Sequence, residues 1–369
     1  MGYLGEVKIS EVDTPALLID LDIMERNLQR AADYAAAHYL RLRPHTKTHK
    51  IPALARKQLD LGAAGITVAK VGEAEVMQRA QPRDLLVAYP ILGESKLKRL
   101  AKLAAEIPVT VALDSVEASR QLSKAAQKAS VQFGVLLEMD AGLGRVGVSP
   151  SELPDLAMQV RTLPNLQIAG FSFYAGHLKP DQNAYRQSLE ELGATIRKTA
   201  DELERAGIHV AIVSGGSTPT LFDSHLIAGL NEIRPGTYIF NDKNTVASGG
   251  CSLEDCAAFL LMTVVSTAKR GQVIVDGGSK TLSSDLLAGS SEPSFGYVVD
   301  APQATVRRLN EEHGYVDVSA ADRTFSIGDR LRVIPNHICV AMNLEEQVYG
   351  FRGDTVEEIW TVDARGKIR

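Results

Sequence analysis

Apolar positions follow two different patterns along the chain, and the first extends from Leu40 to Asp242. There, short apolar runs rich in β-branched residues alternate with longer stretches in which Leu and Ile recur at helical spacing. The runs predict eight strands: Arg41–Lys47, Gly65–Lys70, Asp84–Pro90, Val109–Ser115, Gln132–Asp140, Leu166–Tyr174, His209–Gly215 and Ile233–Phe240. Strands that alternate with helices form parallel sheets, and eight of them favour a closed (β/α)8 barrel, a TIM-like α/β fold. A doubly wound open sheet is the alternative, but it usually has fewer strands and often a glycine-rich turn after the first, which this chain lacks.

The second pattern begins after Asn244, where Gly, Asp and Pro turns separate the apolar runs and long helical stretches are almost absent. This pattern is typical of a mostly β domain. Its expected strands are Phe259–Ser266, Gln272–Asp276, His313–Val318, Arg330–Ile334 and Glu357–Val362. An earlier strand-like run, Ala16–Asp22, precedes the first barrel helix and lies outside the eight strands. We therefore predict a barrel domain over residues 16–244 and a β domain formed by residues 1–15 and 245–369.

Composition and charge indicate which kinds of molecule the protein is expected to bind. The 40 Lys and Arg against 45 Asp and Glu give a net charge of -5 without a basic run, which argues against nucleic acid. No apolar stretch approaches the roughly 18 to 20 residues of a membrane span, and the N-terminus lacks a secretory signal. Three cysteines are an odd number and too few for disulfide bonds to stabilise a fold of this size. We expect a cytoplasmic protein that binds a small molecule.

Polar residues collect where the first predicted strand ends, in the segment Arg43-Pro-His-Thr-Lys-Thr-His-Lys50. Catalytic groups of barrels sit at the carboxyl ends of strands and in the loops that follow. Lys47 lies at the centre of this segment, and a lysine pointing into the barrel mouth would lose hydration. That loss favours the neutral amine, which can form a Schiff base or carry a proton. A solvated basic turn is the simpler alternative.

The loops after the seventh and eighth strands predict a phosphate site. The segment Ser214-Gly-Gly-Ser-Thr-Pro-Thr220 has glycines that let backbone N–H groups approach an anion, and hydroxyl side chains as further donors. Such turns are common, but the next strand carries Arg234-Pro-Gly-Thr-Tyr238, and barrels most often bind phosphate between these two loops. The candidate residues are Gly215, Gly216, Ser217, Thr218, Gly236 and Tyr238.

Two further strand ends carry candidates. The fifth strand leads into Ala-Gly-Leu-Gly-Arg145, a glycine-rich loop that delivers an arginine. The sixth leads into Tyr174-Ala-Gly-His177, where the histidine is a candidate base, although a lone loop histidine is more often a surface residue.

The β domain contains a candidate metal pair in Ile334-Pro-Asn-His337-Ile-Cys339. If this segment continues as a strand, His337 and Cys339 point to the same face and form a clip for a borderline-soft metal such as zinc. Two ligands leave positions for water or substrate, as catalytic sites require. A buried structural pair is the alternative.

Together these motifs resemble the fold-type III pyridoxal-phosphate enzymes, in particular the D-threonine aldolase and D-serine dehydratase group. The likeness covers nearly the whole chain and includes Asp13-Thr-Pro15, Leu18–Asp22, Gly65–Lys70, Glu73 and Glu75. Alanine racemases share the fold, but their lysine sits in a different local sequence and they lack the His-x-Cys pair.

The resemblance implies a role for each candidate. Lys47 holds pyridoxal 5'-phosphate, the loop Gly215–Thr218 with Gly236 and Tyr238 holds its phosphate, and Arg145 and Tyr174 approach its ring. His337 and Cys339 hold a divalent metal, with zinc, manganese and magnesium as candidates and the thiolate favouring zinc. The group forms homodimers in which one subunit's β domain closes the other's barrel mouth, so we expect a homodimer.

The resemblance also implies a substrate, a D-amino acid with a β-hydroxyl group. In a retro-aldol path His177 takes the hydroxyl proton, and the Cα–Cβ bond breaks to give glycine and an aldehyde. In a dehydratase path Lys47 removes the α-proton of D-serine or D-3-hydroxyaspartate, and a keto acid and ammonia result. Whole-chain likeness favours D-threonine aldolase, whereas Cys339 resembles the zinc-binding dehydratases. A non-catalytic protein that carries the cofactor is a remote third possibility.

Overall fold

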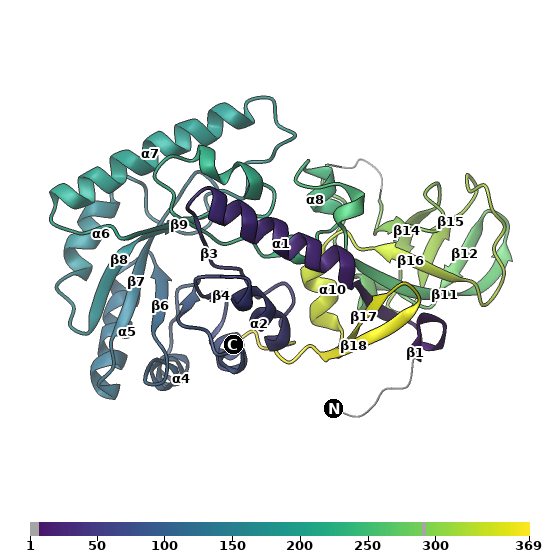
Figure 1. The fold of residues 1–369 in the computed structure, drawn as a ribbon, viewed down its shortest axis with the longest axis horizontal. Helices are drawn as coiled ribbons and strands as arrows, with labels where there is room; N and C mark the ends of the chain where they lie inside the picture. The colour runs from purple at the N-terminus through teal and green to yellow at the C-terminus, as the bar shows by residue number, and fades with distance from the viewer. Residues whose placement is uncertain (1–6, 290–292) are drawn as a thin grey trace. The chain divides into compact units, whose positions relative to one another are not determined.

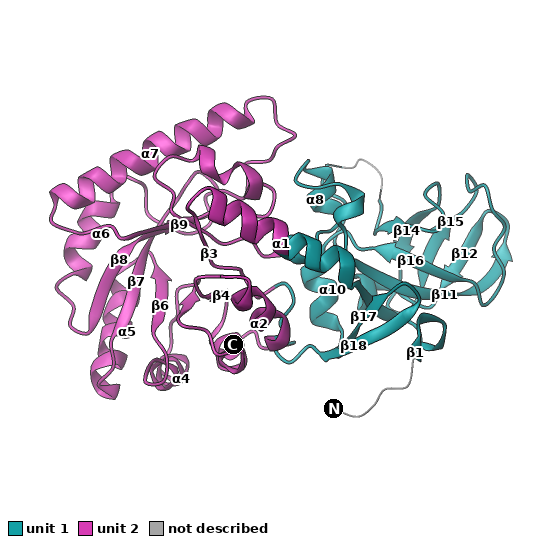
Figure 2. Ribbon diagram, viewed as in Figure 1, with its two compact units in different colours: residues 1–28, 48–51, 237–365 teal, residues 29–47, 52–236, 366–369 magenta. Residues whose placement is uncertain are grey.

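The computed structural model describes residues 7–289 and 293–369 (Figure 1). The chain forms two units, which Figure 2 colours separately. The barrel unit contains residues 29–47, 52–236 and 366–369, and the β unit contains residues 1–28, 48–51 and 237–365. The chain therefore passes between the units several times, whereas the sequence suggested two boundaries, near residues 15 and 244.

The barrel unit contains the eight parallel strands that the sequence predicts. They are β3 (Arg41–Leu42), β4 (Ile66–Val68), β5 (Leu85–Val87), β6 (Val109–Leu113), β7 (Phe133–Met139), β8 (Leu166–Phe173), β9 (Ile212–Gly215) and β10 (Glu232–Ile233). Their order is β3-β10-β9-β8-β7-β6-β5-β4, and a parallel bridge between His45 and Thr67 brings the first and last strands together. The sheet therefore closes on itself, which confirms the (β/α)8 prediction.

Helices accompany the strands, and apolar residues recur along one side of each helix, which packs against the sheet. They are α1 (Leu21–Ala37), α2 (Pro52–Asp60), α3 (Val71–Met77), α4 (Glu94–Ala104), α5 (Val116–Ala129), α6 (Leu153–Val160) and α7 (Tyr185–Arg205). The strands are buried under them: Leu85, Val87, Phe133 and Phe171 have no exposed surface. Near-continuous apolar runs are expected of parallel strands covered on both faces.

The β unit is a ten-stranded, mostly antiparallel sheet in the order β1-β18-β17-β2-β11-β12-β15-β14-β13-β16. Strand β11 also pairs with β16, so the strands from β11 to β16 form a closed ring. The strands are β1 (Val7–Lys8), β2 (Ala16–Asp20), β11 (Ala258–Lys269), β12 (Gln272–Val275), β13 (Tyr297–Val298), β14 (Thr305–Leu309), β15 (Gly314–Asp317), β16 (Arg330–Ile334), β17 (Gln347–Arg352) and β18 (Thr355–Thr361). The early run β2 is outside the eight barrel strands, as predicted, but it lies in this sheet and not in the barrel domain to which residues 16–22 were assigned.

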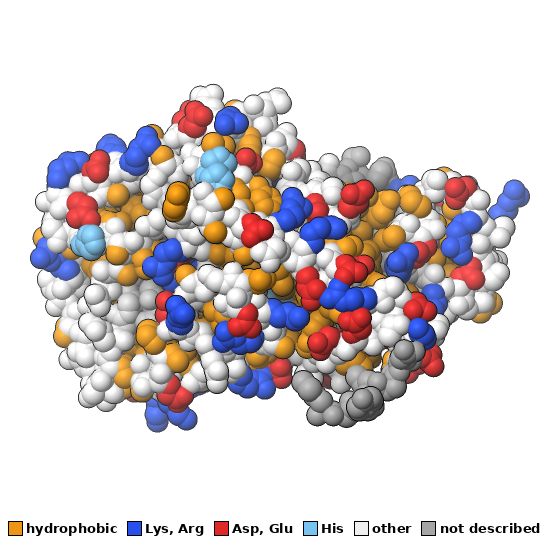
Figure 3. All heavy atoms as spheres, in the orientation of Figure 1, with side chains coloured by type: hydrophobic (Ala, Val, Ile, Leu, Met, Phe, Trp, Pro, Cys, Tyr) orange, Lys and Arg blue, Asp and Glu red, His pale blue; other side chains and the backbone are white. Residues whose placement is uncertain are grey.

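Short helices interrupt the β unit, namely α8 (Lys243–Ala247), α9 (Ser279–Leu282) and α10 (Ile338–Leu344). Its core includes Leu18, Phe259, Leu261 and Phe351, and Cys256 is buried among them. On the face drawn in Figure 3, basic and acidic side chains are interspersed. Among the helices in the described part of the chain, none has both the length and the apolar character that a membrane crossing requires.

Candidate functional site

Lys47 lies in the turn that follows β3, and buried neighbours fix that turn. Thr46 and Thr48 are 1% and 0% exposed, whereas Lys47 itself is exposed. Its backbone N–H donates to Nδ1 of His45 at 3.4 Å. The expected loss of hydration at the lysine is therefore not found, because the residue is exposed. What the structure retains is an accessible amine on a fixed backbone.

Buried charges lie in the barrel next to this turn. Arg43 is 4% exposed, and its Nε lies 2.9 Å from Oε2 of Glu232, while its Nη1 contacts Asp84. Glu232 has no exposed surface and accepts a hydrogen bond from Ser214 Oγ at 2.7 Å. These ion pairs fix the backbone at the ends of β3, β9 and β10 before the candidate loops begin.

Arg234, directly after β10, was not assigned a role from the sequence. It is 9% exposed and donates from Nη2 to the Phe173 carbonyl at 2.9 Å. Burial lowers the pKa of this guanidinium, although Glu138 and Glu232 oppose the shift. In the described part of the chain its Nε is buried and has no hydrogen-bond partner. A charged residue inside an apolar strand run was the signal available in the sequence.

The predicted phosphate loop follows β9 and consists of buried small residues. A Cβ on Gly215 would lie 2.3 Å from the Phe173 ring, and Gly216 has φ +81, so neither position tolerates a side chain easily. Ser217 and Thr218 are 6% and 8% exposed, and Ser217 N–H donates to Thr220 Oγ1 at 3.1 Å. A six-residue 3-10 helix, Leu221–Leu226, follows instead of an α-helix.

The other two phosphate candidates lie where the chain passes between the units. Gly236 is the last residue of the barrel unit before the β unit resumes at Thr237. Tyr238 is 3% exposed in the short 3-10 helix Thr237–Ile239 and belongs to the β unit.

Arg145, Tyr174 and His177 come together in the barrel unit. The Arg145 guanidinium lies over the Tyr174 ring, with 4.7 Å from Cζ to the ring centroid. The loop that carries Arg145 winds around Asp140, whose Oδ1 accepts the backbone N–H groups of Gly142 and Gly144 at 3.0 and 3.1 Å. His177 lies against the same loop, since a Cβ on Gly142 would be 3.4 Å from its Nε2. Among described residues, His177 Nδ1 is buried and lacks a hydrogen-bond partner.

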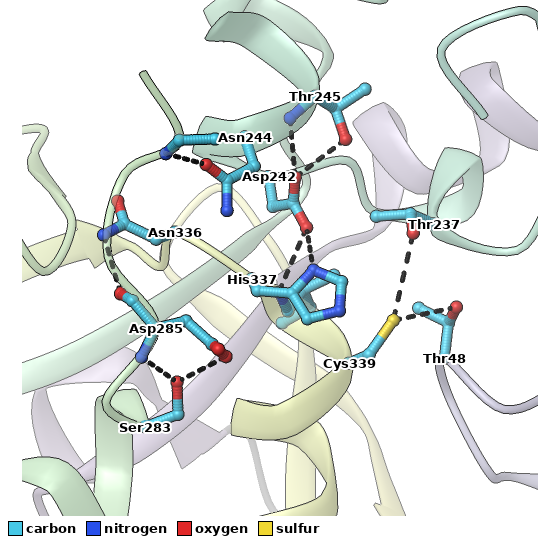
Figure 4. Close-up of polar contacts among 12 residues, drawn as sticks. Thr48, Thr237, Asp242, Asn244, Thr245, Ser283, Asp285, Asn336, His337 and Cys339 are labelled. Carbon is cyan, nitrogen blue, oxygen red and sulfur yellow. Dashed lines mark hydrogen bonds and ion pairs between the residues drawn. The ribbon is translucent and has the colours of Figure 1, made fainter. Parts of the chain in front are cut away.

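His337 and Cys339 are close together, but not in the way the sequence suggested. Strand β16 ends at Ile334, His337 is extended (φ -139, ψ 105), and helix α10 begins at Ile338. The prediction that both side chains stand on one strand face is therefore wrong, because the chain turns into a helix between them. The first turn of α10 nevertheless brings Cys339 beside the His337 ring (Figure 4).

The surroundings of this pair favour positive charge. His337 Nδ1 lies 3.1 Å from Oδ2 of Asp242. The Asp242 carboxylate, followed by the Cys339 side chain, raises the pKa of His337 to about 11 against the effect of burial. Cys339 Sγ lies 3.3 Å from Thr48 Oγ1 and 3.8 Å from Thr237 Oγ1. An environment that stabilises a proton on this imidazole also suits a metal cation on it.

The donor set of the pair fits an open metal site. No three His, Cys, Asp or Glu side chains in the described ranges group as metal ligands. Imidazole and thiolate are ligands that zinc prefers, and a site with few protein ligands leaves positions for water or substrate. The residues present therefore fit a catalytic metal better than a structural one.

Comparison with known families matches both units. The family described as alanine racemase, N-terminal domain, matches residues 19–244, and the putative serine dehydratase domain matches residues 257–351. The 3-hydroxy-D-aspartate aldolase of Paracoccus denitrificans (strain Pd 1222) is 33% identical over 97% of this chain and 93% of that protein. The D-threonine aldolase of an Arthrobacter species is 32% identical over 97% of this chain and 94% of its own. The D-threo-3-hydroxyaspartate dehydratase of Delftia sp. (strain HT23) is 33% identical over 89% and 91%.

Solved structures match over almost the entire chain. D-threonine aldolase from Filomicrobium marinum superposes with a TM-score of 0.91 at 32% identity, covering 99% of both chains. D-threo-3-hydroxyaspartate dehydratase from Delftia sp. HT23 gives 0.85 at 30% identity, covering 96% of this chain and 98% of that one. A cysteine-to-alanine mutant of a D-threo-3-hydroxyaspartate dehydratase, in the metal-free form, gives a TM-score of 0.86 at 30% identity, covering 96% of this chain and 99% of that one.

Proposed function

The chain belongs to the alanine racemase-like family of fold-type III pyridoxal-phosphate enzymes that includes D-threonine aldolase and D-serine dehydratase, and on this basis we propose a lyase of D-β-hydroxy-α-amino acids. We propose D-threonine aldolase activity as the principal reaction. Relatives that match nearly full length bear the names of aldolases and dehydratases, which supports a lyase. The higher TM-score to a D-threonine aldolase, 0.91 against 0.85, supports the choice between them.

Pyridoxal phosphate would be held by Lys47 Nζ, with its phosphate at Gly215–Thr218, Gly236 and Tyr238 and its ring near Arg145 and Tyr174. Bound there, it supplies an electron sink for the bonds of the substrate's Cα. The exposed amine of Lys47 and the positive φ of Gly216 support this assignment. So does the buried, unpartnered Nε of Arg234 among the described residues, because a polar ligand would satisfy it.

A divalent metal would be held by His337 and Cys339, and it would supply a Lewis acid for the substrate's β-hydroxyl group. Asp242 and the hydroxyls of Thr48 and Thr237 support these two ligands through the contacts described above.

His177 is the proposed base, and its buried Nδ1, unpartnered among the described residues, is the observation that carries the retro-aldol proposal. A ring nitrogen without a protein partner is available to a substrate hydroxyl. His177 takes that proton, the Cα–Cβ bond breaks to release an aldehyde, and a proton returned to Cα completes glycine. One proton leaves the β-hydroxyl group and one proton is added to Cα, so the reaction is balanced.

A dehydratase is the second candidate, and Cys339 favours it. D-threo-3-hydroxyaspartate dehydratase has been solved as a histidine-to-alanine mutant and as a cysteine-to-alanine mutant, and these two positions lie two residues apart, like His337 and Cys339. In this path Lys47 Nζ removes the α-proton, hydroxide leaves from Cβ, and the product hydrolyses to a keto acid and ammonia.

Product analysis separates the two candidates. We expect the purified, cofactor-loaded protein to convert D-threonine to glycine and acetaldehyde and to leave L-threonine unchanged, because only one enantiomer aligns Cβ with the ring and the metal together. His177→Ala should lower turnover by roughly 100-fold or more, as removal of a general base does, without releasing the cofactor. If D-threonine gives 2-oxobutanoate and ammonia, and D-serine gives pyruvate, the protein is a dehydratase.

A further inference from the structure

Asp242 lies immediately before helix α8 and is 1% exposed. Its carboxylate accepts four hydrogen bonds (Figure 4). Oδ1 accepts Thr245 N–H at 2.8 Å and Thr245 Oγ1–H at 2.7 Å. Oδ2 accepts His337 Nδ1–H at 3.1 Å and Ile338 N–H at 3.2 Å. Two oxygens offer about four lone-pair positions, so an ionised carboxylate matches its four donors here.

The backbone around Asp242 is fixed from two sides. Asp242 is the N-cap of α8, with extended φ and ψ and a side chain that accepts from Thr245 N–H. The next two residues, Lys243 and Asn244, donate their N–H groups to the carbonyls of Pro335 and Asn336, each at 3.1 Å. The segment that carries the carboxylate is therefore tied to the segment that carries His337.

This arrangement determines which nitrogen of His337 can bind a metal. Because Nδ1 donates its hydrogen to Asp242, the lone pair of a neutral ring resides on Nε2. Figure 4 shows Asp242 at one edge of the His337 ring and Cys339 on the other side. Nε2 and Cys339 Sγ therefore share the side of the ring that faces away from the carboxylate.

We propose that Asp242 is a positioning residue that holds His337 as an Nε2 metal ligand. The inference rests on the proposed metal role of His337 and Cys339. In this role Asp242 is not a ligand: its carboxylate fixes the orientation and tautomer of the His337 ring, and it places a buried negative charge beside that ring. Carboxylates that accept from ligand histidines raise metal affinity in this way.

The substitution Asp242→Asn tests the proposal with little change in shape. An asparagine at this position has two orientations. In the first, its carbonyl oxygen faces Thr245 and its NH2 group faces His337 Nδ1 and Ile338 N–H. In the second, the amide is flipped and its NH2 group faces Thr245 N–H. The first orientation preserves the helix cap but favours the tautomer with hydrogen on Nε2. We expect zinc affinity, measured by competition with a chromogenic chelator, to fall roughly 10- to 100-fold.

Asp255→Asn is the matched control, because Asp255 is also a capping aspartate of the β unit. Its Oδ2 accepts Ser252 N–H at 3.0 Å and Ser252 Oγ–H at 3.1 Å. This variant should bind zinc like the parent. Circular dichroism and thermal melting establish that both variants are folded.

A second measurement needs no variant at position 242. In zinc-loaded protein labelled with 15N-histidine, with His337→Gln used to assign the signal, His337 should carry hydrogen on Nδ1 and zinc on Nε2. Zinc on Nδ1, or unchanged zinc affinity in folded Asp242→Asn, overturns the inference. If zinc affinity is also unchanged in His337→Ala and Cys339→Ala, the proposed metal pair fails instead, so the two failures are distinguishable.

Discussion

At the scale of single residues, the turn that carries Lys47 combines a fixed backbone with an exposed side chain. Thr46 Oγ1 donates to the Thr67 carbonyl at 3.1 Å, which ties the turn to β4. A fixed backbone helps a side chain that must bond covalently to a ligand, because the residue is already positioned before the ligand binds.

Replacing Lys47 with alanine should abolish covalent attachment of pyridoxal phosphate. In the parent, borohydride reduction in the presence of the cofactor should modify Lys47, and peptide mass spectrometry locates the adduct. Lys70→Ala is the control, since Lys70 also follows a barrel strand but its ammonium lies 3.3 Å from the centroid of the Tyr89 ring. An adduct on Lys70 or on any lysine other than Lys47 would contradict the assignment.

Glu345, at the end of α10, should make stability depend on pH. Burial raises the pKa of its carboxyl from 4.5 to about 7, against an opposing effect of Arg365. With a pKa raised in the folded state, this group contributes its full stability below pH 4.5, and that contribution is lost as pH rises through about 7. Glu345→Gln should therefore raise Tm relative to the parent at pH 8 but not at pH 4.5.

The neighbouring Glu346→Gln is the control for this measurement. Glu346 is 83% exposed on its side chain and pairs with Arg365 at 2.7 Å, so its removal should change Tm little at either pH. If Glu345→Gln changes Tm equally at both pH values, the Glu345 carboxyl is not the cause of the pH dependence of stability.

At the scale of elements, sequence patterns recovered the barrel strands because short apolar runs, such as Leu-Leu-Val in β5, alternate regularly with helical stretches. Strands β14 and β17 were missed for identifiable reasons. β14 has two consecutive arginines, Arg307 and Arg308, which break the alternation of apolar and polar positions. β17 has Gly350 in its interior, a residue that strands usually avoid. The helix α10 was missed because the extended residues up to His337 concealed where the strand ends.

The candidate site was predictable where its residues are close in sequence to a strand end. Lys47, Arg145, Tyr174 and His177 all follow barrel strands, and parallel topology alone predicts that such ends share an edge. The role of Asp242 was not predictable, because its contact with His337 joins segments 95 residues apart. Pairings of that range depend on tertiary packing, which local periodicity does not encode.

Gly350 in β17 should not tolerate a side chain. A Cβ there would lie 2.8 Å from Leu21 Cδ2 and 2.9 Å from the Trp360 ring. We expect Gly350→Ala to lower the free energy of unfolding by about 1–3 kcal/mol, measured by urea denaturation. In a Trp360→Phe background, where the far ring atoms are absent, the same change should be less destabilising; equal losses in both backgrounds would exclude the steric explanation.

At the scale of the whole molecule, the proposed cofactor lysine belongs to the barrel unit and the proposed metal ligands belong to the β unit. Chelation of the metal should therefore abolish lyase activity and leave the cofactor attached to Lys47, as followed by its absorbance. The double variant His337→Ala/Cys339→Ala should behave like the chelated parent, and Cys251→Ala, which removes a partly exposed thiol, should remain active. Full activity of the double variant would make the pair structural.

The placement of β2 between β11 and β17 has a consequence for the order in which the newly made chain can fold. β2 is almost entirely apolar, and it is made long before its two partner segments, residues 258–261 and 348–351. One of its hydrogen-bonding edges therefore stays open until residues 258–261 have been made, and the other until residues 348–351 have been made. The barrel strands, between residues 41 and 233, are complete well before then. An unpaired apolar strand is prone to aggregation, so β2 carries this risk from its own synthesis until β17 has been made.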